Sequence, residues 1–309
     1  MIMSRVRKCK IAFFLLLYMM AVALYVHHSQ YNTVSFSKPE KSRVCSCPQC
    51  LTDGDPWFWE LINSAPQPFL SEDYETSEDD FKWWKWEKRN FTLYNATLSK
   101  LFQVIPRVPG VVGSSPDRCR TCAVVGNSGN LNGSSYGSLI DGHDIVIRMN
   151  RGLTKGYEED VGKKTTHHVM YPQSAMRLDN SSRLVFVPFN IYDLQWLENK
   201  FNPNNRIANK DLVMILNPAF MRYVHEAWLD KKGRYPSTGF IAVALSMQMC
   251  DEINVFGFGA DRDGNWNHYF EQIKNKKLRT GPHAGNHEYT IIEELHNKEK
   301  IQFFGKGQG

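Results

Sequence analysis

Two asparagines, Asn127 and Asn150, each follow closely on a short apolar run of the chain. The first run is Cys122–Val125, which ends in a Gly-Asn-Ser-Gly turn, and the second is Asp144–Met149. Such runs indicate buried strands, and parallel sheets bind their ligands at the carboxyl ends of the strands. An amide both donates and accepts hydrogen bonds, so these side chains suit a nucleoside base, a ribose or a phosphate oxygen.

A second group of polar residues begins the segment 234–240, which reads RYPSTGF and continues into an apolar stretch. Pro236 and Ser237 are typical helix-starting residues. Free backbone N–H groups at a helix start, together with the hydroxyls of Ser237 and Thr238, would form an anion site. An ordinary capped core helix is the alternative interpretation of this segment.

Histidine is the side chain whose reference pKa, about 6.5, suits a general base near neutral pH. The chain has ten histidines. From the residues alone, His225, His268, His283 and His287 are competing candidates, since a single histidine is more often structural than catalytic. Adjacent His167 and His168 point to opposite faces of a predicted strand. We expect one of this pair to be packed and the other at most to line a cleft, without a metal.

The sequence Asp261-Arg-Asp263 matches an Asp-x-Asp pattern with which sugar-nucleotide enzymes hold Mn²⁺, because carboxylate oxygens suit hard cations. The same residues, followed by glycine and asparagine, are typical of a turn. We expect a turn and no metal site.

These candidate residues require a scaffold that brings strand ends together. The predicted strands are 122–126, 144–149, 166–171, 184–189, 212–216, 252–258 and 301–304, and helices are predicted at 218–232, 238–250 and 289–299. The alternation predicts an α/β fold with a mostly parallel, doubly wound, Rossmann-like sheet flanked by helices. Before the first strand lies an aromatic segment, in which Trp83, Trp84 and Trp86 stand beside basic residues and would contribute to the core or stack on a sugar; we favour the core. Its tryptophans are Trp57, Trp59, Trp83, Trp84 and Trp86.

The amino-terminal end carries a targeting signal. Ile11–Val26 is an uncharged apolar run preceded by four basic residues, which predicts a single-pass type II signal anchor. The alternative is a cleaved signal peptide, because Ala21-Val22-Ala23 offers a cleavage pattern. The expected order is a cytosolic tail (1–10), the transmembrane anchor (11–26), a stem (27–43) and a luminal catalytic domain (44–309). The short span favours the Golgi membrane.

Cysteine usage fits an oxidising lumen. Six of the seven cysteines follow the anchor: Cys45, Cys47, Cys50, Cys119, Cys122 and Cys250. An even number outside the cytosol predicts disulfides, with zinc knuckles as the alternative, and six cysteines allow about 15 connectivities. Glycosylation sequons begin at Asn90, Asn95, Asn132 and Asn180, and we expect Asn132, inside the Gly-rich turn, to be unmodified. The net charge of +5 is modest and does not indicate nucleic-acid binding.

Four segments together resemble the sialylmotifs of the animal-type sialyltransferases, in the family's order. The large motif is CAVVGNSGNLNGSSYGSLIDGHDIVIRMNR, the small motif contains GRYPSTG and GFGAD, the third contains HYFE, and the very small motif runs from His283 to Glu288. Within the family, GNSGNL, SSYG, DVGKKTTHH, GRYPSTG and GFGAD-x-x-GNW-x-HY are most similar to the β-galactoside α-2,3-sialyltransferases acting on Galβ1-3GalNAc. The resemblance covers most of residues 119–288.

The resemblance implies CMP-sialic acid as donor, a galactose-terminated glycoprotein or glycolipid as acceptor, inversion at the anomeric carbon, and no cofactor. It implies His283 as the general base, His268 as the group that stabilises the departing phosphate, and Glu288 as an orienting residue. Donor-binding positions carried over are Asn127, Asn150, Tyr235, Ser237, Thr238, Gly239, Gly259 and His268. The disulfides implied are Cys122–Cys250, Cys47–Cys119 and Cys45–Cys50.

Two segments differ from the family pattern, and both affect the acceptor side. Residues 196–212 are shorter than their counterpart, and the linker 272–282 is basic and slightly short. The alternatives to an α-2,3-sialyltransferase are therefore an enzyme of another linkage or acceptor, an inactive glycan- or nucleotide-sugar-binding relative, and a metal-dependent transferase. A binding module would not need both His268 and His283, which favours the enzyme.

Overall fold

The structure is a computed structural model, and it describes residues 19–20, 45–48, 50–51, 54–84, 88–110, 115–201, 206–272, 276–277 and 281–305. The chain divides into two units, Met1–Arg43 and Val44–Gly309. The predicted anchor and stem lie outside the described residues, apart from Met19 and Met20, which are helical. Within the described part of the chain, no helix has the length and apolar character needed to cross a membrane.

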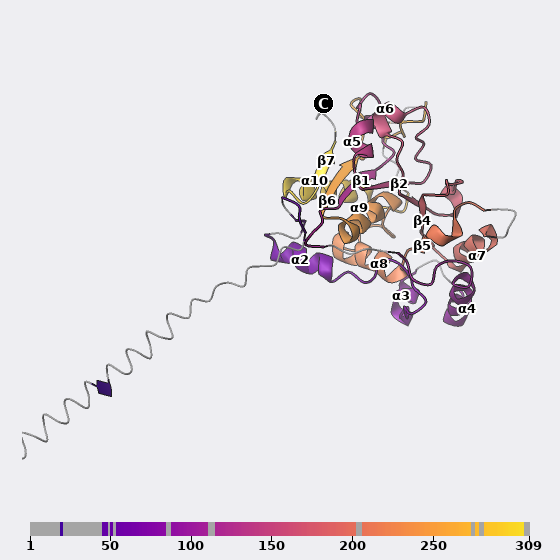
Figure 1. Cartoon of the computed structure of the whole chain (residues 1–309). Helices are drawn as coiled ribbons and strands as arrows, with labels where there is room; N and C mark the ends of the chain where they lie inside the picture. The colour runs from indigo at the N-terminus through magenta and orange to yellow at the C-terminus, as the bar shows by residue number, and fades with distance from the viewer. Residues whose placement is uncertain are drawn as a thin grey trace, which may run out of the picture. The chain divides into compact units, whose positions relative to one another are not determined.

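The second unit is built on a seven-stranded sheet whose order is β5-β4-β3-β2-β1-β6-β7, and every pairing is parallel. Figure 1 shows the sheet between two layers of helices. The strands are β1 (Thr121–Val125), β2 (Ile145–Met149), β3 (His167–Met170), β4 (Arg183–Phe186), β5 (Val213–Ile215), β6 (Glu252–Phe256) and β7 (Gln302–Phe304). All seven predicted strands are confirmed, as is the doubly wound parallel sheet.

The order of the strands determines where a ligand-binding crevice forms at the edge of the sheet. The chain moves outward from β1 to β5 and then returns to add β6 on the other side of β1. This reversal creates a topological switch point between β1 and β6, where open α/β sheets bind ligands beyond the strands' carboxyl ends. Asn127 lies just past β1, and Gly257 lies just past β6.

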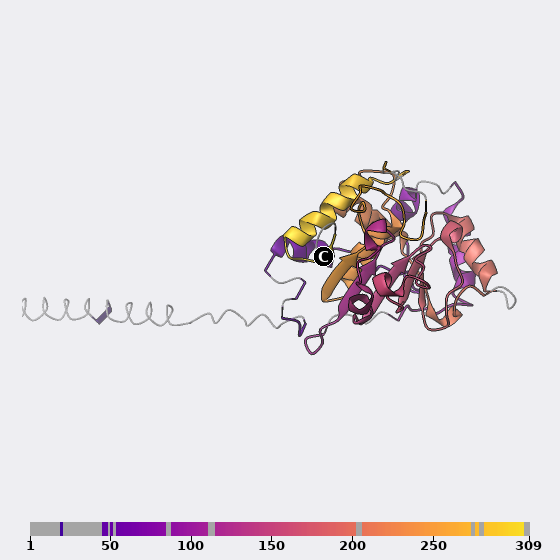
Figure 2. The same ribbon diagram turned by 90° about the horizontal axis from the view of Figure 1, so that it is seen from above.

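Burial on both faces explains why the strands are continuously apolar. Cys122 and Val124 of β1 belong to the core beneath α9 (Thr238–Met249), whereas Ala123 and Val125 belong to the core on the opposite face. Helix α9 contacts β1, β2, β3 and β6. It is apolar almost all round because the sheet covers one side of it and surrounding helices cover the rest. Figure 2 shows these layers of helices and strands from above.

The remaining helices cover the sheet and its β5 end. They are α2 (Pro56–Asn63), α3 (Glu78–Trp83), α4 (Phe91–Leu101), α5 (Gly137–Asp141), α6 (Glu158–Val161), α7 (Ile191–Lys200), α8 (Pro218–Tyr223) and α10 (Gly285–Asn297). The helical stretch predicted over 218–232 is confirmed for 218–228, where α8 runs directly into a π-helical turn, Val224–Trp228. Positive φ angles at Asp230 and Lys231 (49° and 61°) then end the helical path.

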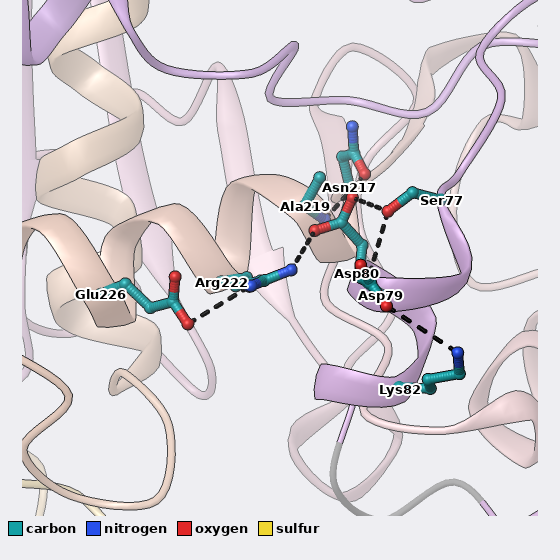
Figure 3. A network of polar contacts seen from close by, with 8 residues as sticks. All are labelled: Ser77, Asp79, Asp80, Lys82, Asn217, Ala219, Arg222 and Glu226. Carbon is teal, nitrogen blue, oxygen red and sulfur yellow. Dashed lines mark hydrogen bonds and ion pairs between the residues drawn. The ribbon is translucent and has the colours of Figure 1, made fainter.

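A polar network holds α3 against α8 (Figure 3). Arg222 pairs with Asp80 (Nη1 to Oδ1, 3.3 Å) and with Glu226 (Nε to Oε1, 3.2 Å). Just beyond α3, the indole N–H of buried Trp84 donates to the Pro188 carbonyl (3.0 Å). The expected core role therefore holds for Trp84, while Trp57 and Trp59 are half-exposed (55% and 50%) and Trp86 lies outside the described residues.

The structure contains three disulfides: Cys45–Cys50, Cys47–Cys119 and Cys122–Cys250. They are the pairs that the resemblance implied. Because the sulfurs are bonded to one another, the zinc alternative does not apply. All three lie toward the amino ends of the strands, since Cys119 precedes β1 and Cys250 precedes β6.

His167 and His168 are both buried, at 5% and 2% exposure, so the expectation that one could line a cleft was wrong. His167 Nδ1 lies 2.9 Å from the Thr166 hydroxyl, and His168 Nε2 lies 2.6 Å from the Asn150 carbonyl oxygen. Both faces of β3 are covered, since its Val169 and Met170 belong to the cores on opposite sides of the sheet.

The domain is expected to lose stability as the pH falls from about 6.5 toward 3. Burial lowers the pKa of His167 to about 3, with smaller contributions from the charges of Arg183 and Arg120. Between these pH values the histidine is protonated in the unfolded chain but neutral in the folded one. The free energy of unfolding therefore falls, by on the order of a few kcal/mol, as the pH decreases through this window. His167→Asn should flatten the dependence of the unfolding free energy on pH, measured by urea denaturation. An unchanged slope would contradict this assignment.

Candidate active site

Asn127 is fixed at the carboxyl end of β1 by its own amide. Its Nδ2 donates to the Met149 carbonyl (3.1 Å), which ties the ends of β1 and β2 together. Its Oδ1 is buried and has no hydrogen-bond partner among the described residues. A buried acceptor left open is costly unless a ligand or water donates to it.

Asn150 adopts a left-handed backbone conformation (φ 54°), which asparagine tolerates better than most residues. Its N–H donates to the Val169 carbonyl (2.8 Å), and its own carbonyl accepts from His168. The Oδ1 is again buried without a partner in the described structure. The two asparagines thus present amide oxygens at the sheet's switch point.

Two adjoining cavities open at this edge. The first, about 430 Å³, is lined by Asn150, Tyr171, Gln173, Phe189, Asn190, Asp193, Tyr235, Ser237, Thr238, Gly239 and His283. The second, about 440 Å³, is lined by Tyr171, Ser237, Phe240, Phe258, Gly259, Trp266, His268, His283, Gly285, Glu288, Tyr289 and Ile292. Tyr171, Ser237 and His283 line both cavities. Of the predicted site residues, only Asn127 lines neither.

Two segments from different motifs pair beside these cavities, and we call them the paired segments, 233–237 and 282–288. The Arg234 N–H donates to the Pro282 carbonyl (2.8 Å). His283 Nδ1 lies 3.1 Å from the Tyr235 carbonyl oxygen, and the Ser237 N–H donates to Glu288 Oε1 (2.8 Å). Glu288 therefore orients the start of α9 by accepting a hydrogen bond from its N-cap residue.

The hydrogen bond of His283 fixes its tautomer. A carbonyl oxygen can only accept, so Nδ1 carries the proton in the neutral ring and Nε2 is the basic nitrogen. The Tyr235 ring also packs edge-on against the imidazole, with 4.9 Å between ring centroids. A half-buried histidine held in this way suits proton abstraction.

His268 is exposed and held by a carboxylate. Its Nδ1 lies 2.8 Å from Glu271 Oε1, its N–H donates to Glu271 Oε2 (2.9 Å), and its ring stacks on Phe270. Partial burial alone would raise the pKa of Glu271, but the hydrogen bonds and charge of His268 lower it overall. The carboxylate accepts a hydrogen bond from Nδ1–H, so Nε2 carries no proton in the neutral ring and can donate to a ligand only from the imidazolium form.

The turns after β1 and β6 cross at glycines. A Cβ on Gly126 would lie 2.3 Å from the Gly257 carbonyl oxygen, and Gly257 itself has φ 71°. Only glycine permits this approach, which lets Ser128 Oγ donate to the Gly259 carbonyl (2.6 Å). The crossing aligns the large and small motifs at one edge.

Asp261 closes a turn, as expected. Its Oδ1 accepts from the N–H groups of Asp263 (3.0 Å) and Asn265 (2.7 Å), and its Oδ2 accepts from the Asn265 amide (2.7 Å). Within the described ranges, the one cluster with metal-ligand spacing is Cys47, Cys119 and Glu252, in which the sulfurs form a disulfide.

Comparison with known proteins decides the family. The model of glycosyltransferase family 29, the sialyltransferases, matches residues 69–300. The chain belongs to glycosyltransferase family 29. It is therefore a glycosyltransferase of the sialyltransferase type, and its disulfide-linked α/β domain is the sialyltransferase fold.

Similar relatives are named for one branch of this sialyltransferase family. CMP-N-acetylneuraminate-beta-galactosamide-alpha-2,3-sialyltransferase 1 of Gallus gallus is 42% identical over 85% of this chain and 82% of its own length. The Homo sapiens protein of that name is 37% identical over 98% of this chain and 99% of its own length. The Rattus norvegicus alpha-2,3-sialyltransferase 2 is 38% identical over 85% and 80%.

Solved sialyltransferase structures have the same fold. A mammalian sialyltransferase crystal structure superposes with a TM-score of 0.75 at 40% identity, covering 85% of this chain and 99% of that one. A mammalian sialyltransferase in complex with Gal-beta-1-3GalNAc-ortho-nitrophenol superposes with a TM-score of 0.74 at 39% identity, covering 84% of this chain and 98% of that one.

Several cavity-lining residues of this sialyltransferase were missed from the sequence. Tyr171 follows β3, and Phe189 follows β4, so the strand-end rule that found Asn127 would also have found them. Asp193 and Tyr289 lie within helices, and no local pattern distinguishes them. Burial raises the pKa of Asp193, partly offset by hydrogen bonds from Phe189 and Asn190 and by the charge of Arg89.

Asn150→Asp is expected to raise the donor KM roughly tenfold with little change in kcat, because a carboxylate replaces the amide opposite an anionic donor. Aspartate tolerates the left-handed backbone, whereas alanine would add strain. The measurement is steady-state kinetics with varied donor. Asn132→Asp, an exposed position on the turn after β1, is the matched control. A donor KM equal to that of the unaltered protein would remove Asn150 from the donor site.

Proposed function

We propose that the protein transfers sialic acid from CMP-sialic acid to the 3-hydroxyl of terminal galactose in Galβ1-3GalNAc glycans, on glycoproteins or glycolipids. The observation that carries this proposal is His283, whose tautomer is fixed by Tyr235 and which lines both cavities. Relatives named as β-galactosamide α-2,3-sialyltransferases support the donor and linkage. The similar structure in complex with a Gal-beta-1-3GalNAc compound supports the acceptor.

The donor binds along the predicted site residues. The buried amide oxygens of Asn150 and Asn127 have no partner among the described residues, and we assign to them hydrogen bonds from the cytosine amino group or the ribose hydroxyls. The N-terminus of α9 offers the backbone N–H groups of Thr238 and Gly239, which with the helix dipole suit the phosphate or the sialic acid carboxylate. Ser237 uses its hydroxyl to cap this helix by accepting from the Phe240 N–H (3.0 Å).

Transfer is a single inverting displacement. His283 Nε2 takes the proton of the acceptor 3-hydroxyl as that oxygen bonds to the anomeric carbon, whose bond to the phosphate oxygen breaks. The electron pair leaves with CMP. His268, as an imidazolium held by Glu271, donates to the phosphate and stabilises its added charge. No metal is needed in this scheme, since one phosphate carries the departing charge.

The proposed location is the Golgi membrane, through the single-pass type II anchor Ile11–Val26. The disulfides support an oxidising lumen for the catalytic domain.

The test is to incubate the protein with CMP-sialic acid and each of Galβ1-3GalNAc, Galβ1-4GlcNAc and Galβ1-3GlcNAc, with and without EDTA. Linkage-specific sialidases then identify the product. Selective α-2,3 transfer to Galβ1-3GalNAc, unaffected by EDTA, is expected. Transfer to another acceptor would overturn the acceptor assignment alone, and loss of transfer in EDTA would overturn the metal-free scheme. CMP binding without any transfer would indicate a binding protein.

A further inference from the structure

The first cavity extends beyond the residues assigned to the donor. Its remaining wall consists of Tyr171, Gln173, Phe189, Asn190 and Asp193. These residues come from the carboxyl ends of β3 and β4 and from the start of α7. The general base has to contact both substrates, and the donor residues occupy the other side of this cavity's lining, so we assign the wall to the acceptor.

The wall has the composition of a sugar site. Phe189 packs against Tyr171 (ring centroids 5.6 Å apart) and Tyr235 (5.0 Å), and Tyr235 continues the row to His283. Aromatic rings offer apolar surface to a pyranose, and the amides of Gln173 and Asn190 can bind hydroxyls.

Asp193 is the one carboxylate on this wall, and it is only 6% exposed. Its Oδ2 accepts from the Phe189 N–H (2.7 Å) and from the Asn190 amide (3.3 Å). Its Oδ1 makes no hydrogen bond with any described residue. One oxygen therefore holds the loop after β4, while the other is available to a ligand in the cavity.

We propose that Asp193 is a specificity-determining residue, which accepts hydrogen bonds from acceptor hydroxyls and excludes acceptors bearing an anionic substituent there. The inference rests on the proposed function. A nearly buried carboxylate binds a neutral hydroxyl strongly because its hydrogen bonds are charge-assisted. A sulfate brought to the same position would meet a like charge where water screens poorly.

The test compares the intact protein with Asp193→Asn on three acceptors: Galβ1-3GalNAc and its derivatives sulfated at C6 of galactose or of GalNAc. For the unsulfated acceptor, KM should rise roughly fivefold to tenfold with the donor KM unchanged. For one sulfated derivative, kcat/KM relative to the unsulfated acceptor should rise at least about tenfold. Which derivative responds identifies the sugar that Asp193 contacts.

Asp179→Asn is the matched control. The Asp179 carboxylate also holds a loop, by accepting from the N–H groups of Ser181 (2.7 Å) and Ser182 (2.8 Å), but it lines neither cavity. The Asp179→Asn variant should keep the acceptor preference of the unaltered protein. Gln173→Glu, at an exposed position on the same wall, should strengthen the discrimination against the responding sulfated acceptor without threatening the fold.

Two outcomes would overturn the proposal. An equal loss of activity with all acceptors, accompanied by a lower Tm, would mean that Asp193 only holds the loop. A raised donor KM would place it on the donor side. If no acceptor is sialylated at all, the proposed function fails separately, and saturation-transfer NMR of Galβ1-3GalNAc with CMP present still decides whether Asp193→Asn weakens sugar binding.

Discussion

Replacing His283 with alanine is expected to lower kcat for sialyl transfer by about 10²–10⁴-fold, the usual contribution of a general base. The acceptor hydroxyl is a poor nucleophile while it keeps its proton, and alanine cannot remove that proton. CMP affinity should be unchanged, because the donor contacts proposed for Asn150 and the α9 N-terminus remain. Turnover is measured with saturating donor and acceptor, and CMP binding by calorimetry.

His287→Ala is the matched control for that experiment. His287 lies four residues along the same segment, near Lys232 (Nδ1 to Nζ, 3.5 Å), and lines neither cavity. The His287→Ala variant should have the kcat of the unaltered protein. Normal turnover by His283→Ala would remove His283 as the base, and loss of CMP binding by that variant would indicate a structural role instead.

Removing the Cys122–Cys250 disulfide, by changing both cysteines to alanine, should lower the free energy of unfolding by about 5 kcal/mol. The bond joins residues 128 apart, so the unfolded chain gains much conformational entropy when it is cut. The same bond connects β1 to the residue preceding β6, the two strands that flank the switch point. Urea denaturation measures the change, and a weaker donor affinity should accompany it.

The Cys45–Cys50 disulfide supplies an internal comparison. Its partners are five residues apart, so its removal should cost only about 2 kcal/mol by the same loop-closure argument. Equal destabilisation by the two pairs of substitutions would contradict the entropic explanation and would indicate that packing around the sulfurs dominates.

The sheet could be predicted because its physical cause is local. A strand buried on both faces needs a short run of apolar residues, and each of the seven runs is visible in the sequence. The helical stretch predicted over 218–232 ends earlier, after Trp228, because apolar spacing does not reveal a π turn or the two left-handed residues that follow it. His167 and His168 were misjudged because strand alternation gives opposite faces, and here both faces are covered.

The residues of the site also include some that the local sequence predicts and others that only the folded structure brings together. Asn127 and Asn150 could be found from their positions after strands, whereas Asp193 could not, since only the packing of α7 beside the sheet brings it into the cavity. The disulfide pairs needed the family resemblance, because spacing leaves about 15 connectivities open. The tautomer of His283 needed the structure, since the Tyr235 carbonyl that fixes it is 48 residues away in the chain.

The paired segments join the start of α9 to the segment that carries His283. Three hydrogen bonds connect 233–237 with 282–288. A ligand that orders the first segment therefore also restricts the second, so less conformational entropy is left for the next ligand to remove. The expected kinetic result is substrate synergism: the acceptor KM should fall as the donor concentration rises, when initial rates are measured with both substrates varied.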